Sequence, residues 1–186
     1  IPAEAGGLNG VIPIGVAANK GVPLVNGDGM GRAFPRLEMV TFTLHGISSS
    51  PMSQADEKGN TAIYNTIDNV WGETLLGSAT IQMGGSSAIG AFPMSGKQVK
   101  LAAVKGIMTF AYEIGKSIID AKKNKENPLE KLLETTKGTK LFQGKISNIK
   151  IASDGRWNKG ICEISGLNEY KDSNLVLDFQ NEFLMA

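Results

Sequence analysis

Two short segments of the sequence combine an acidic residue with several glycines, and both could act on a small molecule. The first, Glu4 to Gly10, places a carboxylate before a glycine-rich turn that leads into a helical pattern. The second, Gly27 to Arg32, holds one acid and one arginine among three glycines. Backbone N–H groups at a helix start can bind an anion or an oxyanion, and two carboxylates at one sheet edge can divide acid and base roles. Glu4 and Asp28 are therefore the candidate catalytic residues.

Both segments also have structural explanations, which the sequence leaves open. Asp28 could accept hydrogen bonds from its own turn, and Asn9 could cap the helix. A dinucleotide site is excluded because the third glycine comes one place early for G-x-G-x-x-G and Phe34-Pro35 disfavours an immediate helix. The segment Gly90 to Gln98 fails the Walker A pattern, since five residues separate its glycines and glutamine replaces Ser/Thr. A helix cap at Ser95 explains this segment.

Histidine and cysteine occur once each, as His45 and Cys162. The sequence therefore excludes an internal disulfide, C-x-x-C motifs and a metal site with several histidines from one chain. We expect His45 to lie at a strand end without a catalytic role, and Cys162 to be a packed thiol in an alternating strand. Any metal would need mainly carboxylate and carbonyl oxygens as ligands.

The composition is that of a folded protein without a charged partner. The 19 Lys+Arg and 18 Asp+Glu among 186 residues give a formal charge of +1, which argues against nucleic acid and anionic membranes as partners. Hydrophobic residues make up 41% of the chain, enough for a core. The longest apolar stretch, Val11 to Ala18, is too short to span a bilayer. Without a signal-peptide pattern before it, we expect a cytoplasmic protein.

The elements expected around the two acidic segments are those of an α/β layer. A helix begins near Pro13 and stops at Gly21, because proline is tolerated in a first turn and glycine favours a helix end. A buried strand over Val22–Val25 leads into the loop Asn26–Gly31. A second covered strand follows over Leu37–Leu44, where apolar residues alternate on both faces.

The rest of the chain predicts hairpins, capped helices and a final meander. The expected elements are a hairpin over Ser53–Asn65, a helix over Asp68–Met83 capped by Asp68, a strand over Ala88–Phe92, a helical stretch from Ser95 to Asn124 broken at Gly106, and a helix that is capped by Asn127 and closes on Gly138. After Gly138, alternating runs with turns at 153–155 and 170–172 predict an antiparallel meander.

Five segments, taken in order, resemble the S-methyl thiohydantoin desulfurase family, a former family of unknown function that is often encoded beside hydantoinase and oxoprolinase genes. They are Glu4–Asn9, Asp28–Pro35, Pro93–Gly96, Leu141–Ile146 and Gln180–Glu182. The string D-G-M-G-R-A-F-P is specific. The family pattern is longer at both ends, so the chain corresponds to its middle portion.

The resemblance implies a fold that is α/β and α+β. Residues 1–35 would form the last portion of an α/β amino-terminal domain. Residues 36–186 would form a mixed domain of helices and antiparallel strands, incomplete at its C-terminus.

The resemblance also implies a hydrolase that acts on a small-molecule substrate, converting an S-methyl thiohydantoin to a hydantoin with release of a thiol. Water would be activated by Asp28 or Glu4, or by a divalent metal bound through the same acids. The substrate-binding residues would be Arg32, Asn9, Gly29, Met30 and Gly31.

Two further hypotheses stay open. The chain could be a non-catalytic subunit or small-molecule-binding module of a hydantoinase-type system, working with a hydantoinase-type partner or as a homo-oligomer. It could also bind a carbohydrate or a nucleotide through the same loops.

Overall fold

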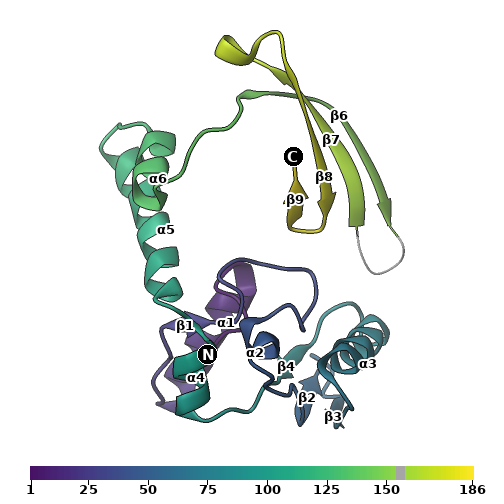
Figure 1. Ribbon diagram of the computed structural model, residues 1–186. Helices are drawn as coiled ribbons and strands as arrows, with labels where there is room; N and C mark the ends of the chain where they lie inside the picture. The colour runs from purple at the N-terminus through teal and green to yellow at the C-terminus, as the bar shows by residue number, and fades with distance from the viewer. Residues whose placement is uncertain (154–157) are drawn as a thin grey trace. The chain divides into compact units, whose positions relative to one another are not determined.

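The computed structural model describes residues 1–153 and 158–186, and the chain forms two compact units (Figure 1). The first unit runs from Ile1 to Ile107 and the second from Met108 to Ala186. Both contain helices and antiparallel strands. This confirms the expected mixture of α/β and α+β structure.

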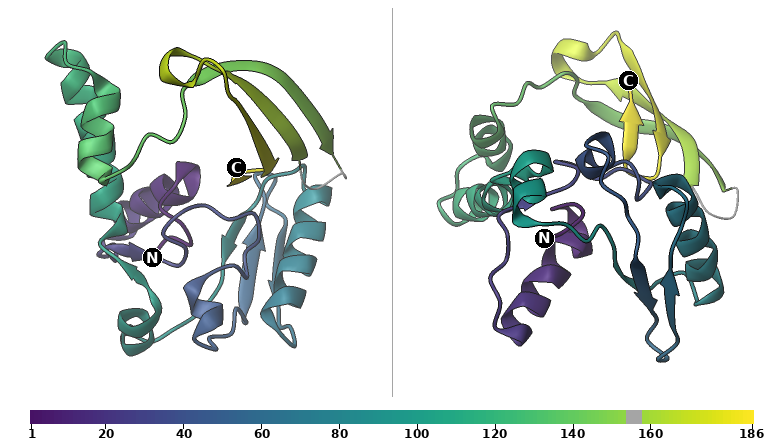
Figure 2. Two further views of the ribbon diagram at one scale, coloured as in Figure 1. Left: turned by 45° about the horizontal axis from the view of Figure 1, so that its top comes forward. Right: turned by 60° about the horizontal axis from the view of Figure 1, so that its bottom comes forward.

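The first unit carries all the candidate site residues. Its elements are, in chain order, α1 (Gly7–Lys20), β1 (Gly27–Asp28), α2 (Thr41–Leu44), β2 (Met52–Ala55), β3 (Thr61–Tyr64), α3 (Asn69–Gln82), β4 (Ala88–Gly90), α4 (Gly96–Ala102) and β5 (Val104–Lys105). The strands pair in the orders β1-β5 and β3-β2-β4. Helix α3 lies alongside the β3-β2-β4 sheet in each view (Figures 1 and 2), where Gln54 donates hydrogen bonds to the Leu76 carbonyl and the Thr80 hydroxyl.

Helix α1 ends where the sequence predicts but begins earlier. Gly21 stops it in the left-handed conformation, with φ at 63°. The start expected near Pro13 is wrong, because the helix begins at Gly7 and Pro13 lies inside it. An internal proline removes one backbone hydrogen bond. The first turn nevertheless packs closely against the segment just before it, since an added Cβ at Gly10 would collide with the Ala5 carbonyl.

The strand expected at residues 22–25 is also wrong. The chain becomes a strand only at Gly27, where β1 finds an antiparallel partner in β5. Gly27 allows this close pairing, because an added Cβ would lie 3.0 Å from the Val104 carbonyl oxygen. The apolar run therefore precedes the strand, and the distant partner decides where the strand begins.

The strand expected at residues 37–44 is replaced by an irregular segment and the short helix α2. Val40 and Phe42 are both buried, and their spacing of two residues imitates a covered strand. Between them, however, the N–H of Thr41 donates to the Gly29 carbonyl (2.6 Å). Residues 29–31 form the loop after β1. The bond from Thr41 to this loop turns the chain away from an extended path.

Most elements of the middle of the chain are confirmed, together with their caps. Strands β2 and β3 form the expected hairpin, and β4 lies within the strand expected after it. The Asp68 side chain caps α3 by accepting a hydrogen bond from the Trp71 N–H, and Ser95 forms a capping box with Gln98 at the start of α4. Gly106, with φ at 77°, marks the break before the next helix.

A small hydrophobic core lies behind the loop after β1. This core cluster consists of Val40, Phe42, Ile47, Phe92 and Ala102. The rings of Phe42 and Phe92 pack with centroids 5.6 Å apart and tilted planes, a favourable arrangement for aromatic pairs. The cluster supports the loop that follows Asp28, because Met30 packs against the cluster.

The second unit consists of two helices followed by an antiparallel meander. Its elements are α5 (Ile107–Lys123), which begins at the unit boundary, α6 (Pro128–Thr136), β6 (Gly144–Ser153), β7 (Asn158–Gly166), the short 3-10 helix η1 (Asn168–Tyr170), β8 (Asn174–Gln180) and β9 (Phe183–Met185). Asn127 caps α6 as expected. The strand order β6-β7-β8-β9 confirms the meander.

Two smaller expectations concern turns and the membrane. The turn expected at 153–155 extends to residues 154 and 155, which lie outside the described residues. The turn expected at 170–172 begins at the last residue of η1. Among the helices of residues 1–153 and 158–186, none has the length and apolar character that crossing a membrane requires.

Candidate functional site

The amino-terminal segment and the loop after β1 are joined by two hydrogen bonds. The N–H of Gly29 donates to the Ala3 carbonyl (2.8 Å), and the N–H of Ala5 donates to Oδ2 of Asp28 (2.7 Å). Glu4 lies between these two anchored residues. The structure therefore brings together the two acidic segments that the sequence singles out.

Asp28 is completely buried, with an exposed fraction of 0%. Its Oδ1 accepts hydrogen bonds from the N–H groups of Met30 (3.1 Å) and Gly31 (2.8 Å), while Oδ2 accepts the bond from Ala5. Hydrogen bonds to an ionised acceptor are stronger than neutral ones. The carboxylate thus holds its own turn together and ties that turn to the amino-terminal segment.

Glu4 is half-buried and meets the start of α1 through Asn9, whose Nδ2 donates to Oε1 of Glu4 (2.6 Å). The cap residue of α1 is Gly6, which has no side chain to accept the first N–H groups of the helix. The N–H groups of an uncapped helix start can bind an anion. Glu4 and Asn9 therefore lie beside donors suited to a developing negative charge.

Two glycines of the loop have conformational and packing reasons to be glycine. Gly31 has φ at 71°, a region that other residues rarely adopt. Gly29 is buried, and an added Cβ would lie 2.8 Å from Cε2 of Phe42 and 3.0 Å from Cγ1 of Val40. The loop thus presents backbone rather than side chains at both positions.

Arg32 follows this loop and is exposed. Its guanidinium carbon lies 5.3 Å from the ring centroid of Phe34, and its Nε donates to the Ala33 carbonyl (3.3 Å). A guanidinium held over an aromatic ring keeps its charge at a fixed place. These contacts hold the guanidinium beside the loop, and the substrate-binding role of Arg32 stays a prediction.

The Gly29→Ala change is expected to lower the free energy of unfolding by about 1–3 kcal/mol, the usual cost of adding a methyl group to a filled core. Urea unfolding measures the change. Gly15→Ala, inside α1 with nothing within 4 Å of the added Cβ, is the matched control and should be neutral or stabilising by up to about 1 kcal/mol. Equal stabilities of the two variants would contradict the packing described for Gly29.

Among the residues that the structure describes, three buried polar residues besides Asp28 are not singled out by the sequence: Ser49, Gln54 and Glu73. Glu73 of α3 is 6% exposed, and its Oε2 accepts a hydrogen bond from the Leu37 N–H (3.0 Å). Gln54 of β2 is 2% exposed, and its Oε1 accepts a hydrogen bond from the Tyr64 hydroxyl (2.6 Å). The signal for Glu73 is its place three residues before Leu76 on one helix face. Glu73 ties α3 to the segment before α2, and Gln54 ties β2 to β3 and α3.

The residues near the loop do not fit a metal centre. In the described part of the chain, no group of three or more His, Cys, Asp or Glu side chains could hold an ion together. The oxygens of Asp28 accept hydrogen bonds from backbone N–H groups. The positive ends of these groups occupy the positions where a cation would bind. His45 is exposed at the end of α2, and Cys162 is half-buried in β7. We therefore derive no step through a metal.

Comparison with protein families gives matches along the whole chain. The model of the S-Me-THD-like N-terminal domain matches residues 1–66, and that of the S-Me-THD-like C-terminal domain matches residues 67–186. Neither this boundary nor that of the compact units falls after residue 35, and the division expected there stays a prediction. Among curated proteins, none matches the chain significantly.

A crystal structure of a protein from Chromobacterium violaceum has the same fold, with a TM-score of 0.72 and 23% sequence identity. The similarity covers 98% of this chain and 51% of that one. The chain thus spans about half the length of this solved structure.

Proposed function

The chain belongs to the S-Me-THD-like family, and on that premise we propose that it hydrolyses an S-methyl thiohydantoin at the loop after β1. The reaction joins the thiohydantoin and water and gives a hydantoin and methanethiol. The observation that carries the proposal is the hydrogen-bonded junction that holds Glu4 beside the Asp28 loop.

Glu4 is the general base in this proposal. Its carboxylate takes a proton from water while the water oxygen bonds to the sulfur-bearing ring carbon. Negative charge then develops on the ring, and the N–H groups at the start of α1 stabilise it. When the carbon–sulfur bond breaks, the sulfur leaves with the electron pair and takes the proton back from Glu4. The second proton of the water moves from the added oxygen to the ring nitrogen, so the carbon becomes the new carbonyl carbon of the hydantoin and the nitrogen its neighbouring N–H group.

Asp28 has a positioning role in this proposal rather than direct contact with water. Its zero exposed fraction and its three N–H donors support this assignment. Gly29 is buried and hydrogen-bonded to Ala3 and Thr41, so it supports the loop. In this proposal Met30 and Gly31 lie beside the ring, and Arg32 holds an anionic side chain or a ring carbonyl. We further propose that the protein works in the cytoplasm with a hydantoinase-type enzyme, since such an enzyme consumes the hydantoin formed.

Reaction in ¹⁸O-labelled water tests the proposal, with the protein at the length that its gene encodes and as the 186-residue chain. We expect one methanethiol for each hydantoin formed, and one ¹⁸O atom in the new carbonyl group. Thiol absent from both proteins, or hydantoin without the label, would contradict hydrolysis at the ring carbon. If the gene encodes further residues, activity of that protein alone would assign part of the site to them.

A non-catalytic subunit of a hydantoinase-type system is the second candidate. The observation in its favour is the exposed apolar surface of α1, where Leu8, Val11 and Val16 are 72%, 62% and 55% exposed. Extended apolar patches mark interaction sites. This candidate predicts a stable complex with a hydantoinase and no thiol release by either partner.

A further inference from the structure

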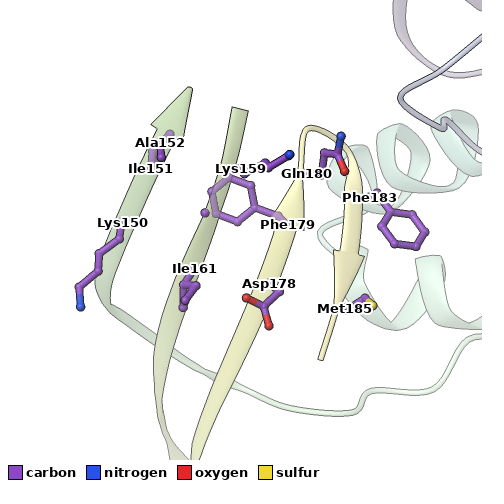
Figure 3. A pocket seen from close by; sticks show the side chains of 11 residues that line it. Lys150, Ile151, Ala152, Lys159, Ile161, Asp178, Phe179, Gln180, Phe183 and Met185 are labelled. Carbon is purple, nitrogen blue, oxygen red and sulfur yellow. The ribbon is translucent and has the colours of Figure 1, made fainter. Parts of the chain in front are cut away.

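The meander of the second unit carries a pocket of about 560 Å³ on its surface (Figure 3). Strand pairing places Lys150, Ile161, Asp178 and Met185 opposite one another across the four strands. Residues that face each other across antiparallel strands share one face of the sheet. The row two residues along, which includes Lys159 and Phe183, lies on that same face. Members of both rows line the pocket.

The pocket has an apolar floor of the size that small molecules occupy. Ile161, Phe183 and Met185 supply the floor and are 39%, 36% and 58% exposed. Ligand pockets typically measure about 300–1,000 Å³ and combine an apolar lining with a few polar groups. An aromatic ring and a thioether favour a flat apolar ligand surface.

Three charged side chains line the same pocket. Lys150 and Lys159 come from β6 and β7, and Asp178 comes from β8 (Figure 3). Asp178 and Lys159 are diagonal neighbours on adjacent strands, and the Cα atoms of such neighbours lie about 7–8 Å apart in antiparallel sheets. Within residues 1–153 and 158–186, Lys150 and Asp178 form no salt bridge. Lys150 and Asp178 therefore offer one cationic donor and one anionic acceptor to a ligand.

We propose that this pocket binds a small planar ring that carries N–H donors and a carboxylate. The ring lies on Ile161 and Phe183, its N–H group donates to Asp178, and its carboxylate accepts from Lys150. A hydantoin with an acidic side chain has this chemistry, and the choice of a hydantoin rests on the proposed function. The pocket would then be a second place where substrate or product binds.

Titration of the ¹⁵N-labelled 186-residue chain with hydantoin-5-acetic acid, followed by NMR, tests this site. We expect the largest amide shifts at residues 150–152, 159–161 and 178–185. Lys150→Gln and Asp178→Asn should each raise Kd by about tenfold, since each loses one charged hydrogen bond. Lys145→Gln on β6 and Asp172→Asn, both exposed and outside the pocket, are matched controls and should bind like the wild type.

The outcomes separate this proposal from the proposed function. The absence of shifts in the meander at about 10 mM ligand would overturn the pocket, because a Kd above that concentration is too weak for a binding site. Shifts confined to residues 4–9 and 27–32 would also overturn it, while supporting the loop as the binding site. Meander shifts that the Lys150 and Asp178 variants do not weaken would overturn the assigned contacts. Meander shifts that both variants weaken, without any thiol release, would leave the pocket standing and remove the hydrolase.

Discussion

Replacing Glu4 with glutamine is expected to lower the rate of thiol release by about 10²–10⁴-fold, the usual contribution of a general base. Glutamine has nearly the same size as glutamate, and its carbonyl oxygen can still accept the hydrogen bond from Asn9. The fold should therefore be preserved while the proton acceptor is lost. Methanethiol formation, followed with a thiol reagent, measures the rate.

The matched control for this change is Glu57→Gln, an exposed glutamate in the β2–β3 turn. It removes the same charge away from the loop and should leave the rate unchanged. Turnover by Glu4→Gln within about twofold of the wild type would remove Glu4 as the base, because general-base catalysis contributes at least about 100-fold.

The Asp28→Asn change is expected to lower the free energy of unfolding by about 2–3 kcal/mol. The asparagine side chain has one accepting oxygen and one NH₂ group. If its oxygen faces Met30 and Gly31, its NH₂ group faces the N–H of Ala5. The opposite orientation places the NH₂ group against the other two donors. In either orientation a buried N–H group loses its acceptor.

Urea unfolding measures this change, with Asp172→Asn at an exposed turn as the control, for which we expect less than about 0.5 kcal/mol. A loss at Asp28→Asn no larger than that of the control would contradict the structural role of the carboxylate. A Met30→Leu change next to it keeps the backbone bonds and should cost less than about 1.5 kcal/mol.

The elements that the sequence predicts correctly are those fixed by neighbouring residues. Asp68, Ser95 and Asn127 each cap a helix by accepting from an N–H two or three residues ahead. The β2–β3 hairpin and the meander likewise join strands that follow each other along the chain. Turn residues and the alternation of apolar and polar residues are local signals, so a single sequence is enough to predict these elements.

The elements that it misses depend on partners far along the chain. β1 begins at Gly27 because its partner is β5, near residue 104, and α2 forms where Thr41 donates to Gly29. From the sequence, we expect Glu4 and Asp28 to lie at the same sheet edge. The structure joins them through the Ala5 N–H instead. No local pattern encodes such a bond.

The sequence also does not predict which polar residues are buried. Gln54 and Glu73 look like surface residues by type, and only their place on faces shared with Met52 and Leu76 distinguishes them. The catalytic and binding roles of the loop residues stay predictions, because a site is defined by what it does to a ligand.

The initial rate of methanethiol release at saturating S-methyl thiohydantoin shows whether Glu4 is the base. It is compared for the wild type, Glu4→Gln and Asp28→Asn at a temperature where all three are folded. We expect release by the wild type, a reduced rate for Asp28→Asn and a rate near background for Glu4→Gln. An inactive wild type, or an active Glu4→Gln beside an inactive but folded Asp28→Asn, would contradict this assignment.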